Sequence, residues 1–148
     1  MVIFGSRIPY TKSIQVANFD GIIGTIFSGV RAGDQFGDAV GPAGDYNLDG
    51  IADLVIGAPN AGTKGDVYVM YGKTGQFQDV TVVGGTVAST AGDLYPASQS
   101  QSGIGGEVWG SFDFNGDGRA DVAVCLPDET SDGQAGAGVF LVHFDLSP

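Results

Sequence analysis

The chain has 148 residues, a formal net charge of −11 at pH 7 and a hydrophobic content of 43%. This length corresponds to one domain or a part of one, and the hydrophobic content excludes a largely disordered chain. The negative charge argues against nucleic acid or an anionic membrane surface as a partner. The 26 glycines stand between many short apolar runs, which predicts an all-β fold with tight turns.

The sequence shows neither a long apolar span nor a charged start followed by an apolar segment. We therefore expect no membrane insertion and no signal peptide within this chain. The single cysteine, Cys125, excludes an internal disulfide. We expect it to be a small buried residue rather than a reactive thiol.

The first apolar run, residues 2–5, reads Val-Ile-Phe-Gly. It resembles residues 67–72 and, more loosely, residues 139–144, so these runs are predicted to be the same strand in three successive units. Residues 6–21 form a polar connector, and a weak strand is expected around residues 25–27.

Two stretches of the chain share one pattern. Residues 45–53 read Asp-Tyr-Asn-Leu-Asp-Gly-Ile-Ala-Asp, and residues 113–121 read Asp-Phe-Asn-Gly-Asp-Gly-Arg-Ala-Asp. Oxygen-bearing side chains fall at positions 1, 3, 5 and 9, and a glycine that permits a sharp turn stands at position 6. Hard cations such as calcium take six to eight oxygen ligands, so each stretch is a candidate calcium loop.

Three carboxylates on so short a loop repel one another unless a cation sits among them. We therefore predict two calcium sites, in which position 7 contributes its backbone carbonyl. The predicted ligands are Asp45, Asn47, Asp49, Ile51 and Asp53 in the first loop, and Asp113, Asn115, Asp117, Arg119 and Asp121 in the second.

An acidic loop of this kind has two other interpretations. An EF-hand needs a glutamate at position 12 and flanking helices, whereas position 12 is Ile56 or Val124 within a short apolar run that favours a strand. An acidic turn that binds no metal is the second alternative.

The remaining elements complete a repeat. Strands are expected at residues 80–83 and 86–87, and residues 88–103 are expected to form a surface loop. The interval from Asp45 to Asp113 equals the interval from Pro59 to Pro127. A fixed period that spans several strands is typical of β-propeller blades.

The first unit resembles the FG-GAP repeat of integrin α-subunit propellers. Phe36-Gly37, the loop at residues 45–53 and then Gly57-Ala58-Pro59 carry the resemblance. The second unit departs from it, because Ile104-Gly105 replaces Phe-Gly and Cys125-Leu126-Pro127 replaces Gly-Ala-Pro. The resemblance implies propeller blades of four antiparallel strands, with calcium bound at the rim by the eight side chains named above.

The resemblance divides the chain into three parts. Residues 1–5 are expected to be an outer strand of a preceding or neighbouring blade, residues 6–72 a first blade and residues 73–148 a second. Closed propellers need four to eight blades, so two blades leave apolar faces uncovered. We expect other blades, from a longer parent chain or from copies of this one, or a foreign protein, to cover them.

Three classes of function are compatible with these features. The first is a non-enzymatic, calcium-stabilised module that binds proteins or mediates adhesion, located by resemblance at a cell surface or outside the cell. The second is a structural subunit or fragment of a larger assembly, in which calcium is a staple. The third is an enzyme or its accessory domain with catalytic carboxylates, which the turn glycines and the alternating oxygen ligands argue against.

Overall fold

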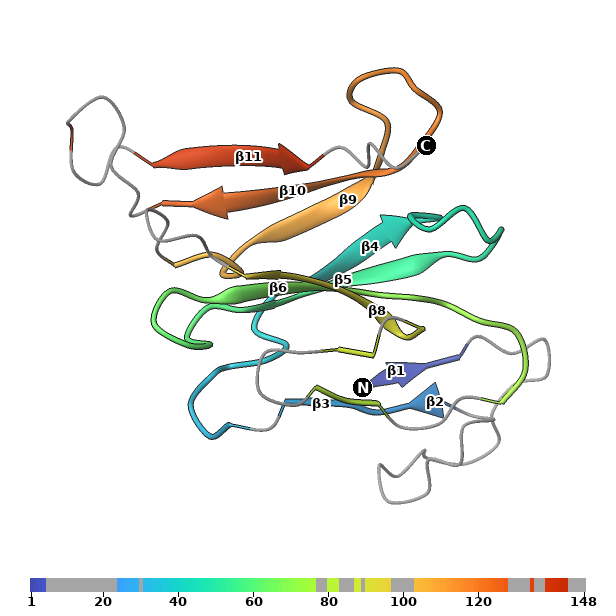
Figure 1. Cartoon of the computed structure of the whole chain (residues 1–148), viewed down its shortest axis with the longest axis horizontal. Coiled ribbons are helices and arrows are strands. Elements are labelled where there is room, and N and C mark those ends of the chain that lie inside the picture. Colours follow the sequence, from blue (N-terminus) through green and yellow to red (C-terminus); the bar gives the residue numbers. More distant parts are fainter. Residues whose placement is uncertain are drawn as a thin grey trace.

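The computed structural model describes residues 1–4, 24–29, 31–76, 80–82, 87–88, 90–96, 103–127, 134 and 138–143. Every regular element within these residues is a β-strand, which confirms the predicted all-β class (Figure 1). Within the same residues, no helix is long and apolar enough to cross a membrane.

Four strands form the largest sheet. They are β4 (Val40–Gly44), β5 (Asp53–Ala58), β6 (Asp66–Met70) and β8 (Gly92–Pro96), and they lie in the order β4-β5-β6-β8. All three neighbouring pairs are antiparallel. Four antiparallel strands laid side by side in chain order are the arrangement of a propeller blade.

A three-stranded antiparallel sheet follows, made of β9 (Val108–Phe112), β10 (Asp121–Leu126) and β11 (Val139–His143). Strands β9 and β10 follow β4 and β5 at the interval that separates the two acidic loops, so the repeat in the sequence is a repeat in the fold. The connection from β10 to β11 is longer than the equivalent connection from β5 to β6.

The leading strand is paired within the chain. Strand β1 (Val2–Ile3) pairs with β2 (Gly24–Thr25), whereas residues 1–5 were expected to be an outer strand of a preceding or neighbouring blade. Strand β3 (Phe27–Gly29) pairs in parallel with β7 (Val80–Val82), which confirms strands in both predicted regions. The long connections that bring these short strands together leave no local pattern in the sequence. The predicted connector at residues 6–21 and the strand residue 86 lie outside the described residues.

Strand β8 corrects the expectation of a surface loop over residues 88–103. Gly92 can pair closely with β6 because it has no side chain. A Cβ at this position would lie only 2.1 Å from the carbonyl oxygen of Val69 and would clash with it. Leu94 packs against a buried cluster, although the strand is half polar. Because β8 belongs to the first sheet, that sheet extends across the predicted blade boundary between residues 72 and 73.

The first sheet is covered on both faces, which explains its continuous apolar strands. One face packs against the second sheet through a group that we call the sheet–sheet cluster: Ala43, Tyr46, Val55, Val67, Val69, Ile104, Val122, Val124 and Leu126. The alternate residues of β5 and β6 point to the other face. With Ala61 from the connection between these strands they form a second cluster: Ile56, Ala58, Ala61, Tyr68 and Met70, with Phe27, Phe36, Val87 and Leu94 packed against it.

Phe36 and Ile104, the repeat partners from the FG-GAP motif, lie at equivalent places. Phe36 stands edge-to-face on Tyr68, with ring centroids 5.3 Å apart, in the second cluster. Ile104 is 5% exposed in the sheet–sheet cluster. Isoleucine thus fills in the second unit the packing role that phenylalanine has in the first.

Glycine permits the close contact between the sheets. A Cβ on Gly57 in β5 would lie 1.8 Å from the carbonyl oxygen of Gly105. A Cβ on Gly65 would lie 2.1 Å from the carbonyl oxygen of Ile104. No larger residue fits at either position unless the backbones move apart.

The substitution Gly57→Ala is expected to lower the free energy of unfolding by about 2 kcal/mol or more, because overpacking forces the two backbones apart. Gly106→Ala is the matched control, because the nearest atom to a Cβ there, Gly103 O, is 3.9 Å away. The control should change stability by less than about 0.5 kcal/mol. Urea unfolding measures both, and equal losses in the two variants would contradict this account of the contact.

Candidate metal-binding loops

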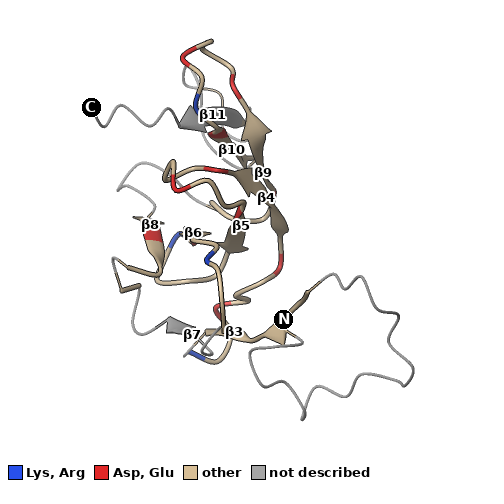
Figure 2. Ribbon diagram, turned by 90° about the vertical axis from the view of Figure 1, so that its right-hand side faces the viewer, with Lys and Arg blue, Asp and Glu red and all other residues tan. Residues whose placement is uncertain are grey.

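Two acidic loops occupy the same positions in the two sheets. Residues 45–52 connect β4 to β5, and residues 113–120 connect β9 to β10. In Figure 1 both loops leave the sheets on the same side of the molecule, and Figure 2 shows acidic residues in both. The topology therefore places both predicted ligand sets at one edge of the stacked sheets.

The first loop is held by its own side chains. Asp45 Oδ2 accepts a hydrogen bond from the backbone N–H of Gly50 at 2.9 Å. Asn47 Oδ1 accepts one from Asp49 at 3.0 Å, and Asp49 Oδ1 accepts one from Ile51 at 2.8 Å. Each predicted oxygen side chain at positions 1, 3 and 5 thus orders the backbone that follows it.

The second loop repeats this pattern. Asp113 Oδ2 accepts from the backbone N–H of Gly118 at 2.8 Å. Asn115 Oδ1 accepts from Asp117 at 3.1 Å, and Asp117 Oδ1 accepts from Arg119 at 2.9 Å. Two separate segments that differ at positions 2, 4 and 7 therefore share one hydrogen-bonded framework.

Two positions in each loop have left-handed backbone conformation. At position 6, Gly50 and Gly118 have φ of 85° and 87°, which accounts for the glycine at that place. At position 4, Leu48 has φ of 61° and Gly116 has φ of 78°. Leucine rarely adopts this conformation, so Leu48 is a strained residue that the rest of the first loop holds in place.

Asp53 closes the first loop from the start of β5. Its side chain is 2% exposed. Oδ2 accepts from the backbone N–H groups of Tyr46 at 2.8 Å and Asn47 at 3.3 Å, and Oδ1 accepts from Gly72 at 2.7 Å. Burial raises the pKa of Asp53 above its ordinary value, an effect that these three N–H groups partly offset and the nearby Asp49 carboxylate reinforces.

Asp121 has the same place in the second loop. It is fully buried, and its Oδ2 accepts from the backbone N–H of Phe114 at 2.6 Å. Its Oδ1 is buried and has no hydrogen-bond partner among the described residues, as is also true of Asp45 Oδ1 in the first loop. A buried carboxylate oxygen without a donor is costly, and a bound cation would satisfy it.

The chemical type of the oxygen groups in each loop therefore suits a hard cation. Each loop offers carboxylate and amide oxygens at four positions and a carbonyl at position 7, which are the groups calcium prefers. Within the described ranges, however, no three acidic, histidine or cysteine side chains are grouped so that they could hold a metal ion as they stand. Asp45, Asp49, Asp113 and Asp117 hydrogen-bond to backbone N–H groups instead, so binding requires them to turn toward a common centre.

The residues at position 2 of the loops also have structural roles that were not predicted. Tyr46 is 2% exposed and belongs to the sheet–sheet cluster, whereas Phe114 is 70% exposed. The signal was an aromatic residue at the same position of both loops. Gly72 was likewise not expected to close the first loop, because only the hairpin pairing of β5 with β6 brings it to Asp53.

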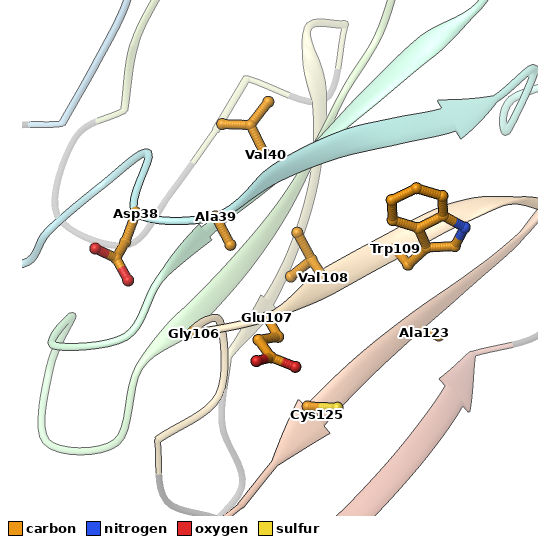
Figure 3. Close-up of a pocket in the computed structure, with 9 residues that line it drawn as sticks. All are labelled: Asp38, Ala39, Val40, Gly106, Glu107, Val108, Trp109, Ala123 and Cys125. Atoms are coloured by element: carbon orange, nitrogen blue, oxygen red, sulfur yellow. The ribbon is translucent and has the colours of Figure 1, made fainter.

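A groove of about 480 Å³ lies between the start of β4, at residues 38–40, and strands β9 and β10 of the second sheet (Figure 3). It includes Glu107, the 63% exposed Trp109 and Cys125. Nothing in the described residues covers Trp109. Cys125 is half-buried in this groove, whereas we expected it to be buried. Burial is the largest cause that raises the pKa of its thiol, and the nearby carboxylate of Glu107 raises it further.

Comparisons with known proteins point to one family. Residues 36–70, which contain β4, the first loop, β5 and β6, match the model of the FG-GAP repeat. The chain is 33% identical over 100 residues to integrin alpha pat-2 of Caenorhabditis elegans and 35% identical over 97 residues to integrin alpha-E of Mus musculus. A third relative, integrin alpha pat-2 of Caenorhabditis briggsae, is 37% identical over 97 residues.

Each of these alignments covers 61% of this chain but only 7% or 8% of the relative. The chain thus spans less than a tenth of the length of these integrin α subunits. The likeness concerns the repeat rather than the whole relative.

Asp53→Asn should destabilise the protein even in the presence of EDTA. The amide group of asparagine leaves one of the backbone N–H groups at Asp53 without an acceptor, which costs about 1–3 kcal/mol. Asp49→Asn is the control, because this exposed side chain keeps an oxygen for the N–H of Ile51, and we expect a change below about 0.5 kcal/mol. Chemical unfolding in EDTA compares the two, and an Asp53 variant as stable as the control would rule out this capping role.

Proposed function

We propose that this FG-GAP repeat protein, a relative of the integrin α subunits, is a calcium-binding β-propeller module that mediates protein interaction or adhesion. We place its action at a cell surface or in the extracellular space, because the relatives it matches are integrin α subunits. The chain supplies only a part of a propeller, and the remaining blades come from a longer parent chain or from copies of itself.

The observation that carries the proposal is the shared framework of the two loops. Both present carboxylate and amide oxygens in the same order and end on a buried aspartate, Asp53 or Asp121. Each loop also has one turn glycine at the position that a calcium loop requires, and buried oxygens without donors remain at Asp45 and Asp121. A loop that served only as a turn needs neither three carboxylates nor a buried orphan oxygen.

Bound calcium would neutralise the repulsion among the loop carboxylates and link ion binding to folding. In the first loop Asp45, Asn47, Asp49 and Asp53 would hold the ion with the carbonyl of Ile51. In the second, Asp113, Asn115, Asp117 and Asp121 would do so with the carbonyl of Arg119. Asp53 also ties the loop to the end of β6 through Gly72, so an ordered first loop stabilises the sheet edge.

We propose a role in binding rather than in catalysis. The loop carboxylates are engaged by backbone N–H groups, as in a structural loop. A protein is the expected partner, since the relatives are integrins by name and the chain is strongly acidic.

A second candidate function is that of a structural subunit in a larger assembly, with calcium as a staple. The exposed outer face of the second sheet favours it. Trp109 and Phe114 are 63% and 70% exposed there and in the adjoining loop, which is unusual for large aromatic side chains.

Calcium is expected to raise the unfolding midpoint relative to EDTA. At a free calcium concentration of 100 times the dissociation constant, each site should contribute about 2.7 kcal/mol. The double variant Asp49→Ala/Asp117→Ala should lose the calcium effect, whereas Asp38→Ala, an exposed aspartate outside the loops, should keep it. Thermal scans with and without calcium provide the measurement, and identical midpoints for the unaltered chain would refute calcium binding.

The purified chain is expected to form particles heavier than one chain, because the exposed rings of Trp109 in β9 and Phe114 in the second loop would be buried by contact with another molecule. Replacing Trp109 and Phe114 by serine should shift the mass toward that of a single chain. Light scattering over a dilution series tests this. A stable single-chain particle formed by the unaltered protein would show that these rings need no such contact.

A further inference from the structure

The two loops are far apart in the sequence, which suggests independent sites, but the fold brings their bases together. Gly44 ends β4 immediately before the first loop. A Cβ on Gly44 would lie 2.6 Å from the Cβ of Ala120 and 3.3 Å from the Cα of Ser111. Ala120 is the last residue of the second loop, immediately before Asp121. The residue that precedes the first loop, Gly44, therefore packs against the last residue of the second loop, Ala120.

A second close approach lies beside the first. Gly110 of β9 has no side chain, and a Cβ there would meet Pro42 O at 2.7 Å, Ala43 Cα at 3.1 Å and Asp121 O at 3.2 Å. The ends of β4 and β9 that lead into the loops are thus in direct backbone contact. Neither loop base can move without moving this contact.

Tyr46 connects the interior of the first loop with the second sheet. Its backbone N–H donates to Asp53, which is a predicted ligand. Its side chain is 2% exposed and lies in the sheet–sheet cluster with Ile104, Val122 and Leu126. The loop therefore contributes a buried anchor to the contact between the sheets.

Tyr95 of β8 contacts the side chain of Tyr46. The two hydroxyl groups are hydrogen-bonded, and the rings meet edge-to-face with centroids 6.5 Å apart at 80°. Phe114 has the same position in the second loop, but it is 70% exposed. The chain thus contains a matched pair of aromatic residues, one inside the sheet–sheet contact and one outside it.

We propose that the two loops form one coupled calcium-binding unit, in which a cation in either loop raises the affinity of the other through the contact between the sheets. This proposal rests on the proposed calcium function. It names Tyr46 and the Gly44–Ala120 contact as the connection.

The sign of the coupling follows from the conformational entropy that a loop loses when it binds an ion. An ion in the first loop would hold the backbone at Tyr46 and so keep its buried side chain between the sheets. The packed sheets hold Ala120 against Gly44, which fixes the base of the second loop. The second ion then binds a loop that is already ordered and loses less conformational entropy. Repulsion between two bound cations acts in the opposite direction, but salt screens it.

Three calorimetric titrations measure the coupling. Asp117→Ala gives the association constant of the first loop alone, and Asp49→Ala gives that of the second. The unaltered chain gives the overall constant for binding two ions. Its ratio to the product of the two single-site constants is the coupling factor, and we expect about 5 or more.

Matched variants test the connection. Tyr46→Leu should bring the coupling factor close to 1, whereas Phe114→Leu, which replaces the aromatic ring at the same position of the second loop, should leave it unaltered. Ala120→Gly removes the methyl group that rests on Gly44 and should also weaken the coupling. Ala52→Gly is its control, because Ala52 is the exposed residue at the same position of the first loop. Ala120→Gly also serves as the milder test where Tyr46→Leu prevents folding.

Each outcome bears on a stated claim. No calcium uptake by the unaltered chain would overturn the proposed function itself. Two sites with a coupling factor of 1 would leave that function standing and overturn the coupling, and a factor below 1 would show that cation repulsion outweighs the shared ordering. A factor of about 5 or more that survives both Tyr46→Leu and Ala120→Gly would overturn the connection proposed here.

Discussion

The contact between the two sheets depends on positions that carry no side chain. Gly57 and Gly65 of the first unit face the backbone of Gly105 and Ile104, and the carbonyl oxygens lie where a Cβ would stand. This approach buries the sheet–sheet cluster and fixes how the two units stack. Because the units stack in one orientation, their acidic loops emerge at the same edge, and the base of one meets the base of the other (Figure 1).

The features that the sequence predicts correctly are local ones. The strands β5 and β10 follow from short apolar runs, and the turn at position 6 follows from Gly50 and Gly118. The repeat is visible because the interval from Asp45 to Asp113 equals the interval from Pro59 to Pro127. The assignment of calcium to the loops remains a prediction, supported by the donor types and by the buried oxygens of Asp45 and Asp121.

The features that the sequence does not reveal depend on contacts between distant residues. Strand β8 is half polar, and its pairing with β6 is possible because Gly92 leaves room for the carbonyl of Val69. Strand β1 finds its partner β2 only across a long connection. Tyr46 and Phe114 are equivalent in sequence, yet one is buried and the other exposed, because within the described residues only the first has a following sheet to pack against.

If both loops are calcium sites, the number of ions bound to each chain follows at once and can be counted. Equilibrium dialysis or calorimetric titration of the unaltered chain gives the number of calcium ions taken up for each chain. The account predicts two, one for each loop. Uptake of none at millimolar calcium would contradict it and would identify the loops as acidic turns ordered by their backbone hydrogen bonds alone.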